Sequence, residues 1–216
     1  MSDPRAAEVH RILERYLIEV VEAFNLCPWA YAARTRGELR VEIVWGPTCE
    51  LTTTCDQARQ ALTSPGASVV MLVFPELLGG ARAIDALRNG VAMRLPEAGV
   101  AAFGPHGNFD LGSPAKLVPF LRRSPDPLLQ LVPFSILDAL RQPRTTLMTA
   151  ELAVQARVLS GLGPPPPTPL VDAIAERNHA TVAPDGGRAL SRVLADIARD
   201  RAQSYQRAGI RHAAAS

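Results

Sequence analysis

The residues best suited to chemistry follow an apolar run that ends at residue 103. His106 stands between a proline and a glycine, directly after residues 100–103, which predict a buried strand. Loops that leave buried strands carry many of the sites of α/β and α+β domains. Imidazole titrates near neutral pH, so His106 could act as a general acid, a general base or a metal ligand, or be an ordinary loop histidine. Asp110 and Asp126 could orient His106 or pair with nearby arginines.

Two adjacent arginines further along the chain could bind an anion. Arg122 and Arg123 precede Ser124 and a second apolar run. Guanidinium groups clamp carboxylates and phosphates through paired hydrogen bonds. We therefore expect Arg122, Arg123 and Ser124 to bind a small anionic substrate. The alternative is that one arginine makes a structural salt bridge or caps backbone carbonyls.

Cys27 is a further candidate for a reactive or metal-binding residue. As a thiolate it could bind haem iron or another soft metal, or act as a nucleophile. Its neighbours in sequence are apolar, so it could instead be a small buried hydrophobe. The remaining thiols, Cys49 and Cys55, match no zinc spacing and are expected to be incidental.

These candidates leave three classes of function open. The first is a small-molecule enzyme, redox in type and dependent on haem, iron or another metal, with Cys27 or His106 as the metal ligand. The second is a cofactor-free enzyme with Cys27 as nucleophile or His106 as general base. The third is a non-catalytic module that binds an anionic metabolite or a protein. We favour an enzyme because polar groups gather where strands end.

Alternating helical and strand patterns predict the elements that position these residues. The pattern favours an α/β or α+β domain with one sheet of about four strands covered by helices, whose strand order stays open. Strands are expected at residues 39–45, 68–74, 99–103 and 128–132, and helices at 9–24, 51–62, 81–94, 134–141 and 146–159.

The C-terminal quarter predicts a helical segment beyond this core. We expect an α/β core over residues 1–162, a proline-rich connector at 163–168, and helices with a frayed tail over 169–216. A long amphipathic helix begins at residue 188 and ends near 207. Its apolar residues could pack on the same chain or on a second subunit, giving a homodimer; they are Leu190, Val193, Leu194 and Ile197.

Composition narrows the class of protein. The 216 residues are 47% hydrophobic and 20% charged, with a net charge of +2 and no long basic block, so we expect no nucleic-acid partner. The N-terminus does not resemble a secretory signal, and the longest apolar run, residues 69–74, is far shorter than the ~20 residues that span a bilayer. We therefore expect a cytoplasmic protein with free thiols and no membrane partner.

Short motifs along the chain resemble one known family. The segments 25–30, 102–105, 123–131 and 176–178 occur in the same order in the uncharacterised bacterial domain-of-unknown-function family fourteen-fifteen, and the resemblance covers about residues 11–181. It implies that Cys27, Arg123 and the triplet containing Arg177 and Asn178 share one site, and it adds the last two residues to the predicted substrate-binding set. It implies no particular reaction.

One departure from the family pattern concerns the histidine. The family reads Phe-His-Pro where this chain reads Phe103-Gly104-Pro105, with His106 two positions later than expected. Either His106 replaces the imidazole through a shift of the loop, or this protein has lost that group.

Overall fold

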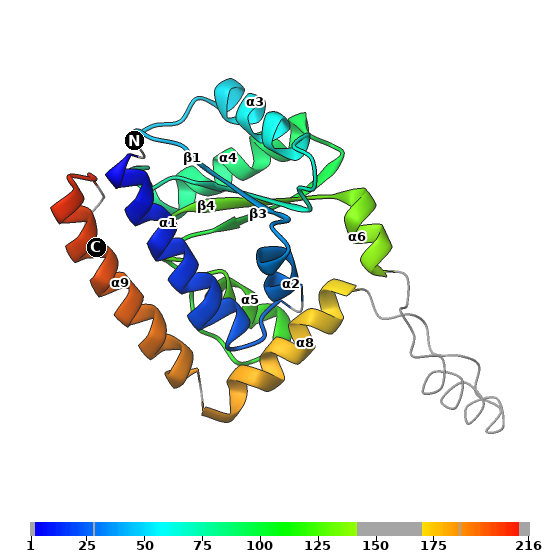
Figure 1. The fold of residues 1–216 in the computed structure, drawn as a ribbon. Coiled ribbons are helices and arrows are strands. Elements are labelled where there is room, and N and C mark those ends of the chain that lie inside the picture. The colour runs from blue at the N-terminus through cyan, green and yellow to red at the C-terminus, as the bar shows by residue number, and fades with distance from the viewer. Residues whose placement is uncertain (1–2, 28, 142–169, 186, 212–216) are drawn as a thin grey trace.

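A mixed sheet of four strands lies between two layers of helices (Figure 1). The computed structural model describes residues 3–27, 29–141, 170–185 and 187–211. Across the sheet the strand order is β1 (Leu39–Ile43), β2 (Val69–Val73), β4 (Leu128–Pro133) and β3 (Ala98–Phe103). The predicted fold class, one sheet of about four strands covered by helices, is confirmed.

Strand β4 occupies a central position that the sequence left open. β1 pairs with β2 in parallel, whereas β4 runs antiparallel to both β2 and β3. Leu128, Leu129 and Leu131 are each at most 1% exposed, so both faces of β4 are covered. A strand that is apolar on both faces is stable only inside a sheet with helices on each side, which explains why β4 lies between its neighbours.

Two helices cover one face of the sheet. α3 (Leu51–Leu62) and α4 (Gly80–Arg94) bury Ala58, Ile84 and Val91 against β2 and β4. Both helices are placed as the sequence predicts, to within one residue.

The N-terminal helix and four others form the second layer. The predicted helix at residues 9–24 begins earlier, because the Asp3 side chain accepts a hydrogen bond from the Arg5 amide and caps it. Its last turns are wider than an α-helix. The elements are α1 (Pro4–Tyr16), the π-helix η1 (Leu17–Glu22), α2 (Ala30–Thr35), α5 (Pro114–Leu121), α8 (Leu170–Val182) and α9 (Arg188–Ala208), with the short η2 (Ala183–Asp185) before α9.

α9 packs on α1 of the same chain. Leu190, Leu194 and Ile197 are buried in a core that α9 shares with α1 and the sheet. The apolar face that could have formed a homodimer is therefore covered within the chain. The same shared core joins the predicted C-terminal helical segment to the predicted α/β core.

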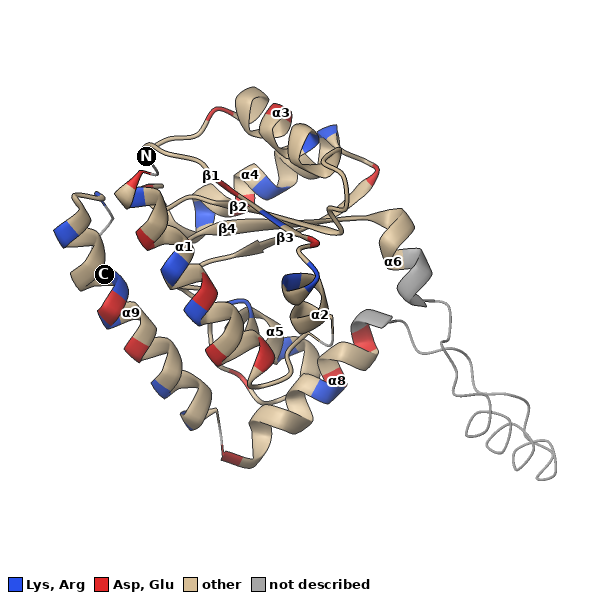
Figure 2. Ribbon diagram, in the orientation of Figure 1, with Lys and Arg blue, Asp and Glu red and all other residues tan. Residues whose placement is uncertain are grey.

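Charged residues line the contact between α1 and α9 (Figure 2). Arg11 binds Asp200 through two hydrogen bonds of 2.7 and 2.9 Å, and Arg15 binds Asp196 at 2.9 Å as well as Asp200. These hydrogen bonds lower the pKa of Asp200 well below its usual range, although partial burial opposes the effect.

The remaining elements complete the described chain. α6 (Phe134–Arg141) follows β4, as predicted. The predicted helix at 146–159, the connector at 163–168 and the C-terminal tail lie outside the described residues. Within the described ranges, no helix combines the length and apolar character that crossing a membrane requires.

Candidate functional site

The ends of three strands meet at one edge of the sheet, here termed the carboxyl edge. β1, β2 and β3 run in the same direction, and their last residues, Ile43, Val73 and Phe103, lie level with Leu128 at the start of β4. Ligands of open α/β sheets bind outside the carboxyl ends of the strands. The loops that leave this edge carry His106 and both predicted anion-binding arginines.

His106 lies beside the first turn of α4. The Gly104 amide donates to the Arg122 carbonyl at 3.1 Å and the Ser124 amide donates to the Gly104 carbonyl at 2.9 Å, which joins the end of β3 to the end of α5. Two residues later the exposed His106 ring faces Gly80, where an added Cβ would lie 3.9 Å from Cδ2. The ring makes no hydrogen bond with any described residue, so both nitrogens are free for a ligand.

Arg122, at the end of α5, presents a positively charged side chain near Asp85 and Arg88 of α4. Its side chain reaches solvent, yet surrounding protein atoms partly desolvate the guanidinium and lower its pKa. Repulsion from Arg88 on α4 lowers the pKa further, while Asp85 acts in the opposite direction. The Arg122 guanidinium has no hydrogen bond or ion pair with a described residue. Since arginine stays protonated in proteins, the local excess of positive charge favours an anion.

The start of α4 adds free backbone amides to this region. Gly79 and Gly80 adopt left-handed conformations with φ of 91° and 56°, and no side chain caps the helix. The first amides of a helix lack internal partners and attract anions. We define the α4 site as Gly79, Gly80, Arg88, His106 and Arg122.

The other predicted residues of this loop lie outside the α4 site. The Arg123 guanidinium lies 5.7 Å from the centre of the Phe120 ring. Ser124 is 2% exposed and its hydroxyl donates to the Asp126 carbonyl at 2.6 Å, so it is closed to a substrate, contrary to prediction. Asp110 accepts from the Gly112 amide at 2.7 Å and lies 3.6 Å from Lys116 Nζ, and it makes no described contact with His106.

Two buried carboxylates on the carboxyl edge fasten the terminal helices. Asp126 accepts from Arg201 at 2.7 and 2.8 Å and from the Tyr205 hydroxyl at 2.6 Å, both on α9. Glu76 accepts from Arg5 at 3.0 Å, and from the amides of Gly46 and Arg211. We term Glu76, Asp126, Arg201 and Tyr205 the α9 clamp.

The α9 clamp corrects one prediction and adds residues that sequence reasoning missed. The expected pairing of Asp126 with His106, Arg122 or Arg123 is wrong, because α9 supplies its partners. A glutamate directly after a buried strand, as in Pro75-Glu76, was the one local signal of the clamp. Burial and the negative charge of Asp126 raise the pKa of Tyr205, so its hydroxyl remains a donor.

Cys27 lies in a separate turn, after η1. Asn25 has a left-handed φ of 50°, which is uncommon for a residue other than glycine. Arg177 donates to the Asn25 carbonyl at 3.0 Å and Asn178 Nδ2 donates to the Leu26 carbonyl at 3.1 Å. The structure therefore brings together three of the residues that the family resemblance assigns to one site. Arg123 makes no described contact with this turn.

Two polar atoms of the Cys27 turn are buried without partners. Asn178 is 6% exposed and its Oδ1 accepts no hydrogen bond, while Arg177 Nε donates none. The buried Tyr16 lies near the half-buried Cys27, and burial, then the thiol, raise the pKa of its hydroxyl. Buried polar atoms without partners are rare in native proteins and are often accounted for by a bound molecule or a functional role.

Cys27 and His106 belong to different parts of the molecule. Leu26 packs in the core of the α1 and α9 layer, whereas His106 lies against α4, which covers the opposite face of the sheet (Figure 1). Among the residues that the structure describes, no three histidine, cysteine or carboxylate side chains gather as a metal would need. The predicted metal ligands therefore do not form one cluster.

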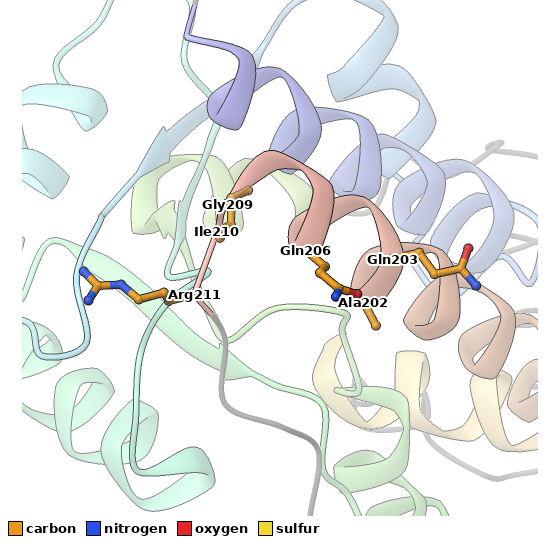
Figure 3. A pocket seen from close by; sticks show the side chains of 6 residues that line it. All are labelled: Ala202, Gln203, Gln206, Gly209, Ile210 and Arg211. Carbon is orange, nitrogen blue, oxygen red and sulfur yellow. The ribbon is translucent and has the colours of Figure 1, made fainter.

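Two of the hollows in the described surface bear on these sites. The larger, about 690 Å³, lies at the end of α9 (Figure 3), and no predicted site residue lines it. The smaller, about 370 Å³, lies between α3, α4 and the loops after β1 and β2. Ala83, on the first turn of α4, lines this smaller hollow, which places it beside the α4 site. The larger hollow is lined by Ala202, Gln203, Gln206, Gly209, Ile210 and Arg211.

Comparisons with family models, curated proteins and solved structures found no match. The resemblance to family fourteen-fifteen therefore stays a prediction.

Proposed function

We propose that the protein is a cofactor-free enzyme that binds a small anionic molecule at the α4 site and uses His106 for acid–base chemistry on it. The observation that carries the proposal is the Arg122 guanidinium, which has no hydrogen bond or ion pair with a described residue and is repelled by Arg88 while Asp85 acts in the opposite direction. Hydrogen bonds to charged groups contribute ~1.5–3 kcal/mol each, so an anion that neutralises this region is bound favourably.

The position of His106 supports its role in catalysis. An anion held by Arg122 and the first amides of α4 lies beside the imidazole, since the ring faces Gly80. A general acid or base needs to reach its proton directly or through one water molecule. Neither ring nitrogen is occupied by a described residue. The haem- or metal-dependent redox reaction expected from Cys27 or His106 stays a prediction.

Thermal unfolding in the presence of inorganic phosphate tests the anion site. Phosphate raises the unfolding temperature of the native protein if it binds the folded state. Arg122→Ala loses that increase. Arg36→Ala is the matched control, because Arg36 is an exposed arginine at the end of α2 with no described side-chain partner. An equal increase in all three proteins would show that phosphate acts without a site.

Nuclear magnetic resonance tests the place of His106 in the same site. Its ring signals shift on addition of phosphate and saturate at the concentration that saturates the thermal effect. The same signals stay fixed in Arg122→Ala. If phosphate raises the unfolding temperature but leaves the His106 ring signals unchanged, the anion binds away from His106 and the catalytic role of His106 is ruled out.

A second candidate function, nucleophilic chemistry by Cys27, is favoured by Arg177, whose guanidinium binds the Asn25 carbonyl in the turn that carries the half-buried thiol. The rate of alkylation by iodoacetamide tests it, with Cys49 as an internal control whose pKa is raised by burial. Cys27 reacts at least tenfold faster than Cys49 if it is an activated nucleophile. Equal rates would reduce Cys27 to a structural thiol.

A further inference from the structure

We infer that two copies of this chain pair through the free edge of β1, so that their two sheets join into one across a twofold axis. The pairing does not depend on the proposed function. β1 is the first strand in the order across the sheet, with β2 on one side and no described strand on the other. An edge strand with free backbone groups is a template for pairing with another chain.

The backbone of β1 has free hydrogen-bonding groups on its outer side. The Val44 amide and the Glu38 carbonyl both bond to β2. Because the backbone groups of a strand point to alternate sides, the even-numbered residues of β1 face β2. Leu39, Val41 and Ile43 therefore direct their amides and carbonyls away from β2. These outward groups make no hydrogen bond with a described residue.

The charged side chains of β1 favour pairing with a second copy. The strand reads Leu-Arg-Val-Glu-Ile, with one charge of each sign on either side of its centre (Figure 2). When two such strands run antiparallel about Val41, Arg40 of each copy lies opposite Glu42 of the other. These positions fall between hydrogen-bonded pairs, where opposite Cα atoms are only ~4.5 Å apart and opposite charges attract. Neither side chain has a hydrogen bond or ion pair with a described residue.

The other face of the strand is apolar in the same arrangement. Leu39 of each copy lies opposite Ile43 of the other, and Val41 lies opposite its own counterpart. These side chains are half-buried in the single chain and pack against the core that contains α1 and α9. They belong to the residues with free outward backbone groups, so each residue donates and accepts one hydrogen bond across the axis.

Other positions of the axis fit less well. The axis has to pass through an odd-numbered residue, because only those residues have free outward groups. At Ile43 it would leave both charges without an opposite charge. At Leu39 the pairing would meet Gly37, whose left-handed φ of 70° ends the extended strand. Only an axis at Val41 pairs every residue of β1.

Sedimentation of charge-reversed variants tests the pairing. A contact made mainly by one five-residue strand lies at the low end of specific interfaces, so we expect the native dimer to dissociate on dilution. Arg40→Glu places like charges opposite each other on both sides of the axis and raises the dissociation constant about tenfold or more. Glu42→Arg has the same effect. Arg192→Glu is the control, because it makes the same change of charge at an exposed position on α9 and leaves the dimer intact.

Mixing the two variants identifies the contact. Arg40→Glu and Glu42→Arg each repel a second copy of themselves, but they present opposite charges to each other on both sides of the axis. The mixture therefore forms a dimer at a concentration at which each variant by itself is a monomer. That dimer also shows that both variants are folded. A mixture that stays monomeric where the native chain is a dimer would overturn the inference.

Hydrogen exchange locates the pairing on the backbone. The Val41 amide exchanges slowly where the native chain is a dimer and rapidly after dilution, whereas the Glu42 amide, which faces β2, exchanges slowly in both states. A native chain that is monomeric at every concentration up to ~1 mM would overturn the inference. A dimer with rapid exchange at Val41 would place the interface elsewhere, and slow exchange in the monomer would show that the edge is already covered; either result overturns it.

Discussion

Two regions of the carboxyl edge differ in whether their charged side chains have partners within the chain. In the α9 clamp, the buried Asp126 carboxylate has both oxygens hydrogen-bonded, one by Arg201 and one by Tyr205. In the α4 site, the Arg122 guanidinium is repelled by Arg88, attracted by Asp85, and has no hydrogen bond or ion pair with a described residue. Both regions lie at the same ends of the strands, so position in the fold does not explain the difference.

The contrast indicates which charges hold the fold and which serve a ligand. Removing a charge from water costs free energy that a partner must offset. The α9 clamp offsets the cost within the chain, across 75 residues between Asp126 and Arg201. The Arg122 guanidinium of the α4 site is exposed and has no hydrogen-bonded partner among described residues, so it remains open to an anion from solution.

The largest expected effect comes from breaking the α9 clamp. Arg201→Ala leaves the buried Asp126 carboxylate without its ion pair and lowers the free energy of unfolding by about 3–5 kcal/mol. Urea denaturation measures this change. Arg199→Ala is the control, since Arg199 is exposed and pairs only with Asp196 among described residues. A loss below 1 kcal/mol for Arg201→Ala would show that the clamp does not stabilise the fold.

Asn178, with one side-chain hydrogen bond made and one acceptor unused, lies between the fully bonded Asp126 and the unbonded Arg122 guanidinium. Asn178 donates to Leu26 but leaves its Oδ1 unpartnered. Asn178→Ala frees the buried Leu26 carbonyl and is expected to destabilise the protein by ~1–3 kcal/mol. Urea denaturation against Glu176→Ala, an exposed neighbour on α8, checks this. Equal stability of the two variants would mean that the amide makes no net contribution to the fold.

Acid tests the paired charges between α1 and α9. The pKa of Asp200 in the folded state lies below its ordinary value of 3.8, so folding favours the ionised form. This stabilisation is complete at pH 6 and is lost as the pH falls through 3.8 and below. In thermal unfolding between pH 6 and 3, Asp200→Asn therefore depends less steeply on pH than the native protein, by about 1 kcal/mol. Parallel curves would contradict the role of Asp200.

The smallest expected effect on stability is at Arg122. Arg122→Ala changes the free energy of unfolding by less than about 0.5 kcal/mol, because no side-chain hydrogen bond is lost and the end of repulsion from Arg88 offsets the lost attraction to Asp85. Arg201→Ala is expected to cost far more free energy of unfolding, so the difference between the two variants measures how differently the α9 clamp and the α4 site contribute to stability. Urea denaturation without added anions checks it. A loss of 2 kcal/mol or more would show that Arg122 is a structural residue and would end the comparison.

The amino-acid sequence by itself determined most of the local structure. Apolar residues at spacings of three and four placed α3, α4 and α9, and continuous apolar runs placed β2 and β4. These patterns succeed because each element must turn a continuous apolar surface to the core. The sequence also singled out Cys27, His106 and Arg122 beside strand or helix ends, whereas Arg177 and Asn178 entered only through the family resemblance. It did not foresee the capped start of α1, since one hydrogen bond from Asp3 leaves no periodic pattern.

Tertiary structure alone decided which of these groups meet. The antiparallel insertion of β4 brings the residues after β3 and α5 together. Asp126 binds Arg201 of α9 and not Arg122 or His106. Asn178 contacts Leu26 across 152 residues, a pairing that no local pattern encodes. Local patterns fix which face of an element is apolar, whereas contacts between distant residues depend on strand order and helix docking. For that reason the unpaired charge of Arg122 became visible only in the folded chain.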